Sequence, residues 1–193
     1  MPKTNDEILD IFKQSGAFLE GHFVLTSGLH SPHYVEKFRV LEHPDLTAQL
    51  CAEFDEQWGG EKPTVVIGPA TGGIILAHET AKQLGVSAMF TERLDGKMTL
   101  RRGFNVGPED RVLLVEDVVT TGGSVFEVID VVKETGAQIL GLAFLVDRSG
   151  GKVDFGVPSK ALLTLDVVTY QPDSCPLGDA GTPVTKPGRS GKS

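Results

Sequence analysis

The chain has 193 residues, a length that fits one domain spanning 1–193, and its composition of 40% hydrophobic and 23% charged residues predicts a folded core. With 18 lysines and arginines against 26 aspartates and glutamates, the net charge of −8 argues against a general nucleic-acid binder, although a local basic cluster could still hold an anionic ligand. No apolar run approaches the roughly 18 residues of a membrane span, and residues 1–10 lack a signal-peptide layout, so we expect a cytoplasmic protein without membrane contact.

The first third of the chain predicts two helices around a glycine-rich region. Thr4 and Glu7 have the spacing of a capping box, ahead of an apolar stripe at Ile8, Leu9, Ile11 and Phe12. Between 17 and 34, glycines and a proline interrupt short apolar stretches, which favours a small β-hood or a loop region. Residues 44–58 predict a second helix, ended by two consecutive glycines.

From residue 64 onward, predicted strands alternate with predicted helices. The strands are expected at 64–67, 87–91, 111–115, 138–146 and 161–165, and the helices at 73–84 and 121–135. This alternation predicts a mostly parallel α/β sheet with right-handed crossovers, and the continuously apolar strands indicate that helices flank both faces. Residues 92–108 are expected to form a long charged loop, and residues 171–193 an irregular arm or a frayed tail.

The cysteines and histidines show no metal-binding spacing. Cys51 and Cys175 stand outside any C-x-x-C or Cys/His cluster in the sequence, so we expect reduced thiols and no structural zinc site. His30 and His33 flank a proline, and a helix would not carry both on one face there, so surface or loop roles are favoured over a metal pair.

Residues 112–124 hold the most specific pattern in the chain. An apolar strand is predicted to deliver Glu116 and Asp117 to its carboxyl end, where open α/β sheets bind ligands. The residues that follow are Thr120, Thr121, Gly122, Gly123 and Ser124, whose glycines and hydroxyls before a helix are typical of a phosphate cradle. Carboxylates beside such a cradle suggest a phosphorylated sugar with Mg²⁺. The alternative is an acidic strand end followed by an ordinary helix cap.

This segment resembles the phosphoribosyl pyrophosphate motif of the type I phosphoribosyltransferases. Four further segments, at 26–32, 68–73, 98–104 and 147–149, resemble the orotate phosphoribosyltransferase family and lie in that family's order. The resemblance runs from about residue 5 to about residue 187. It implies the type I fold, with a mostly parallel sheet and a small hood built from about 1–36 and 166–193. It also implies transfer of phosphoribosyl to orotate, which gives orotidine 5′-monophosphate in pyrimidine synthesis.

The resemblance also implies roles for individual residues. Phosphoribosyl pyrophosphate is expected to bind Arg93, Lys97, Arg101, Glu116, Asp117, Val118, Val119, Thr120, Thr121, Gly122, Gly123 and Ser124, with Lys97 and Asp117 as catalytic residues. Ala70, Thr71 and Gly72 are expected to form the pyrophosphate loop, and Thr26, Thr120 and Arg148 to bind orotate. Mg²⁺, held mainly by the substrate near Glu116 and Asp117, is the expected cofactor. A homodimer that shares its basic loops is the expected assembly.

The residues themselves are compatible with these roles. The loop 68–73 follows a strand and opens a helix, so it predicts a second anion site at the same sheet edge. The basic segment 93–102 is either a solvated loop or a flap over pyrophosphate, and two nearby anion sites favour the flap. Arg148 matches the carboxylate of orotate, although it could instead pair with Asp147 or face solvent.

Several positions depart from the family pattern. Many relatives carry lysine or arginine at the positions of Thr26, Leu29 and Gly72, and lysine at that of Arg93. Gly178 stands where close relatives tend to carry a second cysteine, so we expect no metal or redox role for the tail. Two other functions stay open: transfer to another base such as a purine, and a non-catalytic sensor of phosphoribosyl pyrophosphate. The acidic net charge argues against a nucleic-acid-binding regulator.

Overall fold

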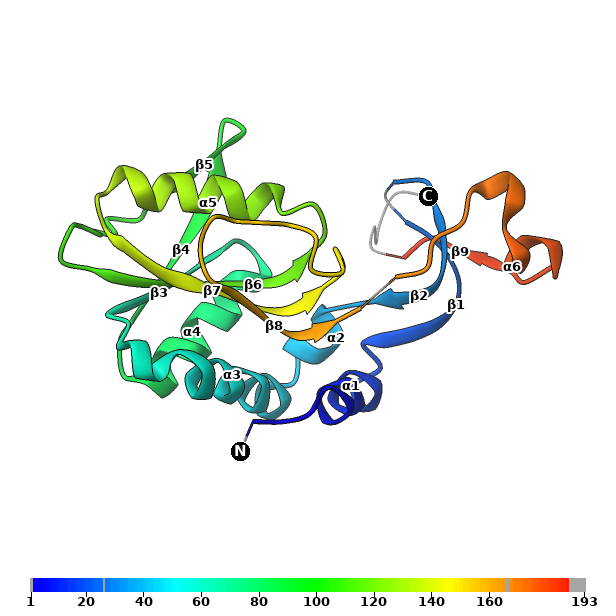
Figure 1. Ribbon diagram of the computed structural model, residues 1–193, viewed down its shortest axis with the longest axis horizontal. Helices are drawn as coiled ribbons and strands as arrows, with labels where there is room; N and C mark the ends of the chain where they lie inside the picture. The colour runs from blue at the N-terminus through cyan, green and yellow to red at the C-terminus, as the bar shows by residue number, and fades with distance from the viewer. Residues whose placement is uncertain (1, 26, 166, 188–193) are drawn as a thin grey trace.

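A computed structural model describes residues 2–25, 27–165 and 167–187 (Figure 1). In chain order its main elements are α1 (Asn5–Gln14), β1 (Phe18–Val24), β2 (His30–Val35), α2 (Phe38–Leu41), α3 (Pro44–Trp58), β3 (Val65–Pro69), α4 (Gly72–Leu84), β4 (Ser87–Leu94), β5 (Lys97–Leu100), β6 (Arg111–Val119), α5 (Gly123–Glu134), β7 (Gln138–Asp147), β8 (Ser159–Thr164), α6 (Pro176–Asp179) and β9 (Val184–Thr185). Short 3₁₀ turns lie at Gly59–Glu61 and Pro172–Ser174. No helix among these described residues is long and apolar enough to cross a membrane.

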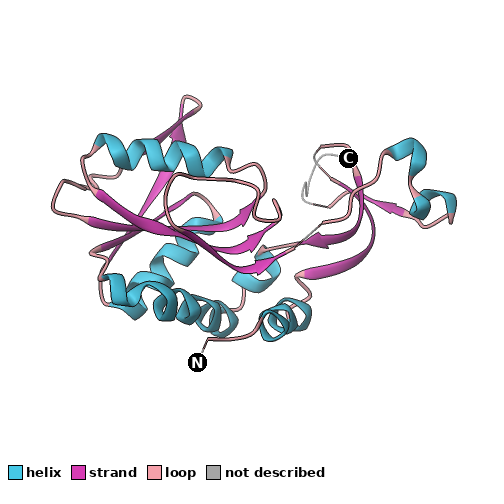
Figure 2. Cartoon of the chain, in the orientation of Figure 1, coloured by secondary structure: helices cyan, strands magenta, loops and turns pink. Residues whose placement is uncertain are grey.

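A six-stranded sheet in the order β5-β4-β3-β6-β7-β8 forms the centre of the molecule. Its strands pair in parallel except for β5, which runs antiparallel to β4. Helices α3 and α4 lie on one side of the sheet and α5 on the other (Figure 2). The mostly parallel, helix-flanked sheet predicted from the alternating pattern is therefore confirmed.

The hydrophobic core lies on both faces of this sheet because successive side chains of a strand point to opposite sides. Leu113 and Val115 of β6 pack into the cluster on the side of α3 and α4. Val112 and Leu114 pack into the second cluster, with the apolar residues of α5. Both faces of β6 are thus covered, which is why its sequence reads as an uninterrupted apolar run.

A smaller three-stranded sheet, in the order β2-β1-β9, forms a hood beside the main sheet (Figure 1). β1 and β2 form an antiparallel pair, and β9 from the C-terminal arm joins β1 in parallel. The hood is therefore built from the N-terminal region together with the C-terminal arm, as the resemblance implied.

Of the two alternatives for the C-terminal segment, residues 172–185 form the arm, with short helical turns and a strand that pairs with β1. The structure corrects two predictions about the hood and this arm. His30 lies in a strand and its ring contacts the buried ring of His22, so it is not simply a surface histidine. Cys175 is buried against the same ring, so it does belong to a Cys/His cluster, which forms only in the folded chain.

Two predicted boundaries along the main sheet were wrong. The segment 92–108 is not one long loop, because β4 continues to Leu94 and turns into β5. Met98 and Leu100 of β5 pack against the cluster on the α5 side, so this charged segment does have an apolar anchor. Strand β6 continues past residue 115 to Val119, which places the acidic pair inside the strand, near its carboxyl end.

Candidate functional site

The candidate site lies where three parallel strands end at one edge of the main sheet. β3 and β6 are neighbours, and the chain leaves them on opposite sides, since β4 lies beyond β3 and β7 beyond β6. Such a switch point opens a crevice at the carboxyl ends of the strands. The loop after β3, the loop after β6 and the end of β7 therefore meet there.

The loop after β6 forms the predicted cradle. Gly122 has a φ of +78°, and a Cβ there would lie 2.7 Å from the ring of Phe155, so both the backbone and the packing require glycine. The next residues open α5, whose first N–H groups have no partner within the helix. Thr120, Thr121, Gly123 and Ser124 are exposed and, with Gly122, line a cavity of about 270 Å³. This arrangement offers backbone N–H groups and hydroxyls to an anion.

Val118 and Val119 belong to β6 rather than to the cradle loop. Val119 is buried in the core, and its carbonyl accepts a hydrogen bond from the backbone N–H of Arg148 at 2.8 Å. Both valines border the cradle cavity, but Val119 mainly anchors the strand end to β7. This hydrogen bond connects the end of β6, where the cradle begins, to Arg148, which is expected to bind orotate.

Asp117 forms a close ion pair with Lys37, which precedes α2. The Nζ of Lys37 lies 2.8 Å from Oδ1 and 2.7 Å from Oδ2 of Asp117. Oδ1 also accepts the backbone N–H of Val118 at 2.6 Å. Because Asp117 is only 2% exposed, Lys37 neutralises a carboxylate that is largely removed from bulk water.

Glu116 is held differently, although it is the neighbouring residue. Its Oε1 accepts the backbone N–H of Asp117 at 2.8 Å. Burial first, and then the negative charge of Asp117, raise the pKa of Glu116 to about 8. Near neutral pH burial therefore favours the protonated form of Glu116.

The loop Ala70–Gly72 crosses the same edge beside the acidic pair. Ala70 and Thr71 are exposed, and the peptide bond between them is cis. Gly72 is buried, and a Cβ there would fall within the carboxylate of Asp117. A larger side chain at position 72 would collide with Asp117, which explains the glycine there. The cation that neutralises Asp117 comes instead from Lys37.

Arg148 lies in a second cavity, of about 500 Å³, between the strand ends and the hood. The lining residues are Leu25, Ser27, Tyr34, Thr120, Thr121, Arg148, Val167 and Thr169. Burial lowers the pKa of the Arg148 guanidinium and raises that of the Tyr34 hydroxyl. Asp147 accepts the backbone N–H groups of Ser149 and Gly151 at 2.6 and 2.7 Å, so its carboxylate holds the turn that follows.

The basic residues of the β4–β5 hairpin divide between three places. Arg93 lines the cradle cavity and pairs with Glu127 at 2.8 Å. Lys97 lines a different cavity, of about 820 Å³, between the hairpin and α5. Arg101 lies 3.5 Å from Glu92, which also binds Arg102. Arg93, Lys97 and Arg101 are the hairpin residues predicted to bind substrate. Of these, only Arg93 is among the described residues that line the cradle cavity of the same chain.

The structure also shows contributors that sequence reasoning missed. Lys37 and Tyr34 are far from the cradle in sequence, and nothing in their local pattern distinguishes them from other surface residues. They reach the site because β2, which contains Tyr34, and the residues that follow it lead from the hood to the edge of the main sheet. There Tyr34 and Lys37 border a cavity with Val118, Thr120 and Arg148. Thr26, expected to bind orotate, lies outside the described residues.

Comparison with known proteins agrees with this geometry. A family profile described as "Phosphoribosyl transferase domain" matches residues 39–156. The chain is 54% identical over 183 residues to the orotate phosphoribosyltransferase of Desulforamulus reducens, covering 95% of this chain and 96% of that protein. It is 53% identical over 185 residues to that of Pelotomaculum thermopropionicum, covering 96% of this chain and 97% of that protein.

Solved structures show the same fold. The orotate phosphoribosyltransferase from Aeropyrum pernix superposes with a TM-score of 0.69 at 30% identity, over 82% of this chain and 93% of that chain. The adenine phosphoribosyltransferase from Rhodothermus marinus shares the fold with a TM-score of 0.64 at 23% identity, over 83% of this chain and 100% of that chain. The fold alone therefore does not choose the base. The extent and identity of the sequence matches place this chain in the phosphoribosyl transferase family, among the orotate phosphoribosyltransferases.

Proposed function

We propose that this site transfers the phosphoribosyl group from 5-phosphoribosyl 1-pyrophosphate to orotate, giving orotidine 5′-monophosphate and pyrophosphate. The observation that carries the proposal is the position of Thr120. It borders the cradle cavity and also the cavity that contains Arg148. A single nucleotide can therefore place its phosphate in the first and its base in the second. The named relatives, about half identical over nearly their full length, support the same activity.

The proposal gives each part of the sheet edge one task. The cradle from Thr120 to Ser124 binds the 5′-phosphate through backbone N–H groups and hydroxyls. Glu116 and Asp117 bind the two ribose hydroxyls, with protonated Glu116 able to donate as well as accept. The loop from Ala70 to Gly72 binds pyrophosphate, with Arg93 adding positive charge.

Arg148 selects orotate among the possible bases. Its guanidinium can form paired hydrogen bonds with the ring carboxylate, which uracil and the purines lack. The wall around it is partly apolar, through Leu25 and Val167, and the Tyr34 hydroxyl offers a further polar contact. Partial removal of water from Arg148 strengthens its attraction to an anion.

The donor set fits Mg²⁺ that arrives with the substrate. Lys37 already neutralises Asp117, and burial favours the protonated form of Glu116, so neither carboxylate offers a free charge for direct ligation. The pair suits hydrogen bonds to the water shell of an ion held by pyrophosphate. When bound, the ion reduces the charge on the departing pyrophosphate.

Lys97 and Arg101 act in this proposal across a homodimer. Within one chain, the hairpin projects past α5 (Figure 1), and Lys97 is not among the described residues that line the cradle. A second subunit that receives this hairpin would gain the cations that its own cradle lacks. Mixing a Lys97→Ala subunit with an Asp117→Asn subunit should restore one intact site per heterodimer. No recovery of activity after demonstrated subunit exchange would refute the shared site.

Catalysis then depends on positioning and charge rather than on a covalent intermediate. The base nitrogen approaches the anomeric carbon as pyrophosphate leaves, through an oxocarbenium-like state. The cradle and Arg148 fix the two reactants, while Lys97 meets the charge that develops on pyrophosphate.

The direct test is a product assay with phosphoribosyl pyrophosphate, Mg²⁺ and a panel of bases. Orotidine 5′-monophosphate should form with orotate, with little product from uracil, hypoxanthine or adenine, and omission of Mg²⁺ should remove most of the activity. Turnover of a purine without orotate would favour the alternative base. Binding of phosphoribosyl pyrophosphate with no turnover of any base would favour the non-catalytic sensor.

A further inference from the structure

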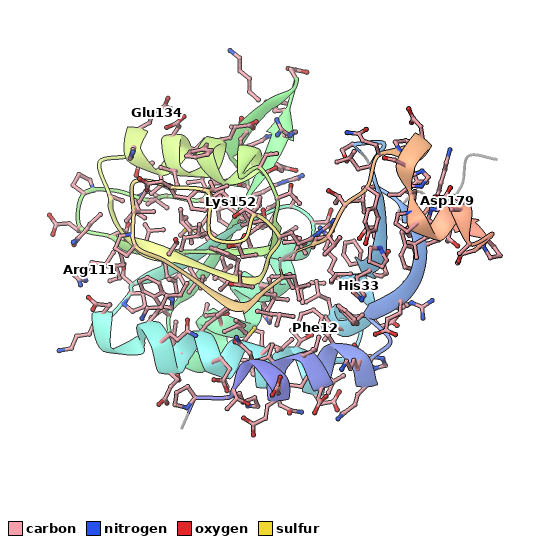
Figure 3. All side chains as sticks on the ribbon, turned by 45° about the vertical axis from the view of Figure 1, so that its right-hand side comes forward. Phe12, His33, Arg111, Glu134, Lys152 and Asp179 are labelled. Atoms are coloured by element: carbon pink, nitrogen blue, oxygen red, sulfur yellow. The ribbon has the colours of Figure 1, made fainter. Side chains whose placement is uncertain are left out.

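A second polar cluster lies away from the sheet edge, where the C-terminal arm crosses the hood. His22 comes from β1, His30 from β2 and Cys175 from the residue before α6. Their ligand atoms all lie within 4.8 Å of one another. Figure 3 locates this region by His33 on the hood and Asp179 on the arm. His22 and Cys175 are only 2% and 1% exposed, so the cluster is largely shielded from water.

The hydrogen bonds fix the tautomer of a neutral His22 ring. Its Nδ1 lies 2.9 Å from the carbonyl oxygen of Thr182. A carbonyl oxygen can only accept, so Nδ1 carries a proton, and in the neutral ring Nε2 then presents a lone pair to the cluster. Metal-binding histidines commonly have such a partner on the other ring nitrogen, which orients the ring.

Two neighbours compete for that single lone pair. The Nδ1 of His30 lies 2.7 Å from Nε2 of His22, and the Sγ of Cys175 lies 3.5 Å from the same atom. A lone pair accepts one good hydrogen bond, so two donors in a nearly dry site cannot both be well satisfied. One cation in place of the two protons would satisfy all three atoms.

We propose that His22, His30 and Cys175 bind a Zn²⁺ ion that fastens the C-terminal arm to the hood. Two imidazoles and a thiolate are preferred ligands of Zn²⁺. Tetrahedral zinc would separate N and S by about 3.6 Å and two N atoms by about 3.3 Å, given the usual bond lengths. The Cys175–His22 distance already fits, and the two rings must move apart by about 0.6 Å.

Binding changes the protonation of two ligands. The thiol of Cys175 loses its proton to solvent and becomes the thiolate that binds the ion. His30 moves its proton from Nδ1 to Nε2, which frees Nδ1 as a ligand without a change in charge. One proton is therefore released for each ion bound, and the loaded site carries one net positive charge.

The fourth coordination position lies near Gly178. A Cβ at this residue would lie 3.8 Å from Cβ of Cys175 and 3.8 Å from Cε1 of His22, which are ordinary contacts. A cysteine at 178 would therefore fit without collision and would reach toward the ion. With glycine there, the three side chains leave that position to water or to a small exogenous ligand.

The site links the arm to the cavity that contains Arg148. Tyr170 of the arm exchanges backbone hydrogen bonds with His30, at 2.9 and 2.8 Å. Val167 and Thr169, three residues or fewer before Tyr170, line the cavity wall. Zinc bound to His30 and Cys175 would hold the arm from Tyr170 to Cys175 against the hood. This would stabilise the adjoining cavity wall, which precedes Tyr170.

The test compares metal binding in matched cysteine variants of the full chain. Wild-type protein stripped with a chelator should take up one Zn²⁺ per chain by elemental analysis, and Co²⁺ should give a thiolate-to-metal charge-transfer band. About 100-fold Zn²⁺ over the dissociation constant should raise Tm by roughly 5–10 °C. Cys175→Ala should lose the band and the shift, whereas Cys51→Ala, which removes the other buried thiol, should keep both.

A gain-of-ligand variant tests the location independently. Gly178→Cys should bind Zn²⁺ at least tenfold more tightly, because it adds a fourth protein ligand to a partly built site. Each Tm shift is measured with and without Zn²⁺ in the same variant, so a loss of stability from the substitution itself cancels. Absence of Zn²⁺ uptake by wild type would overturn the proposal, as would a cobalt band that survives Cys175→Ala or an affinity unchanged by Gly178→Cys.

Discussion

Replacing Lys37 by methionine removes the cation that neutralises Asp117 while keeping a side chain of similar length. The carboxylate of Asp117 is almost fully buried and bonds Nζ of Lys37 through both oxygens. Methionine therefore leaves a buried charge with one backbone N–H as its remaining strong partner among the described contacts. We expect a destabilised protein whose defect is located at Asp117.

The size of the effect follows from the geometry of the pair. Two unit charges 2.7 Å apart attract by about 6 kcal/mol at an effective dielectric constant of about 20. Desolvation offsets part of this attraction, and the Lys37 side chain is still 33% exposed, so water replaces some of what is lost. The expected loss of unfolding free energy is about 1–3 kcal/mol, below the range for breaking a fully buried pair.

A double-mutant cycle isolates this interaction. Unfolding by urea would be measured for wild type, Lys37→Met, Asp117→Asn and the double variant. Lys37→Met should cost about 1–3 kcal/mol in the wild-type background and less than about 0.5 kcal/mol beside Asp117→Asn. Lys82→Met is the control, because Lys82 pairs with Glu79 at an exposed site and should cost less than about 0.5 kcal/mol. Equal costs of Lys37→Met in both backgrounds would refute the reasoning.

Four further predictions concern the substrate site. Folding raises the pKa of Glu116 from 4.5 to about 8, so between these pH values the native state binds more protons than the unfolded state. The free energy of unfolding should therefore fall as pH rises through this range. Glu116→Gln should flatten the fall when unfolding by urea is measured at several pH values, and the same pH dependence in wild type and variant would contradict the prediction. Arg148→Ala should raise KM for orotate by about ten- to a hundredfold and KM for phosphoribosyl pyrophosphate much less; Arg148→Lys should recover only part, and equal loss for both substrates would indicate misfolding. Lys97→Ala should lower kcat at least tenfold with little change in ground-state binding, and the reverse pattern would exclude transition-state stabilisation by Lys97. Gly72→Ala should weaken phosphoribosyl pyrophosphate binding about tenfold or more by displacing Asp117, which calorimetric titration would detect, and an unchanged affinity would show that the loop can move aside.

The cradle could be predicted from the sequence because its parts are consecutive. Residues 112–124 contain the strand, the acidic pair, the glycines and the start of the helix, and each imposes its own local geometry. Gly122 illustrates this, because its left-handed φ is a local backbone conformation that favours glycine over other residues. The capping box at Thr4 and Glu7 was equally local, and the structure contains it.

The β4–β5 hairpin was missed because local composition opposed it. Charged residues dominate the segment, and its strand character depends on Met98 and Leu100 packing against the α5 side of the core. Such packing exists only after the sheet has formed, so composition alone predicted a solvated loop. In this hairpin Arg93 lines the cradle cavity and Lys97 lines the cavity beside α5.

What the sequence by itself determined was the set of local devices: the strand–cradle–helix unit, the glycine-bearing loop between β3 and α4, and the alternation that produces a parallel sheet. Each depends on residues within about one helical turn or one strand of each other, whose spacing sets which backbone conformations and faces are possible. Only the tertiary structure brought Lys37 onto Asp117, 80 residues away, and Cys175 onto His22, 153 residues away. Such pairs have no sequence signal because nothing in local conformation relates their positions. Lys37 reaches Asp117 because the hood meets the carboxyl edge of the main sheet, and Cys175 reaches His22 because the arm folds back onto the hood.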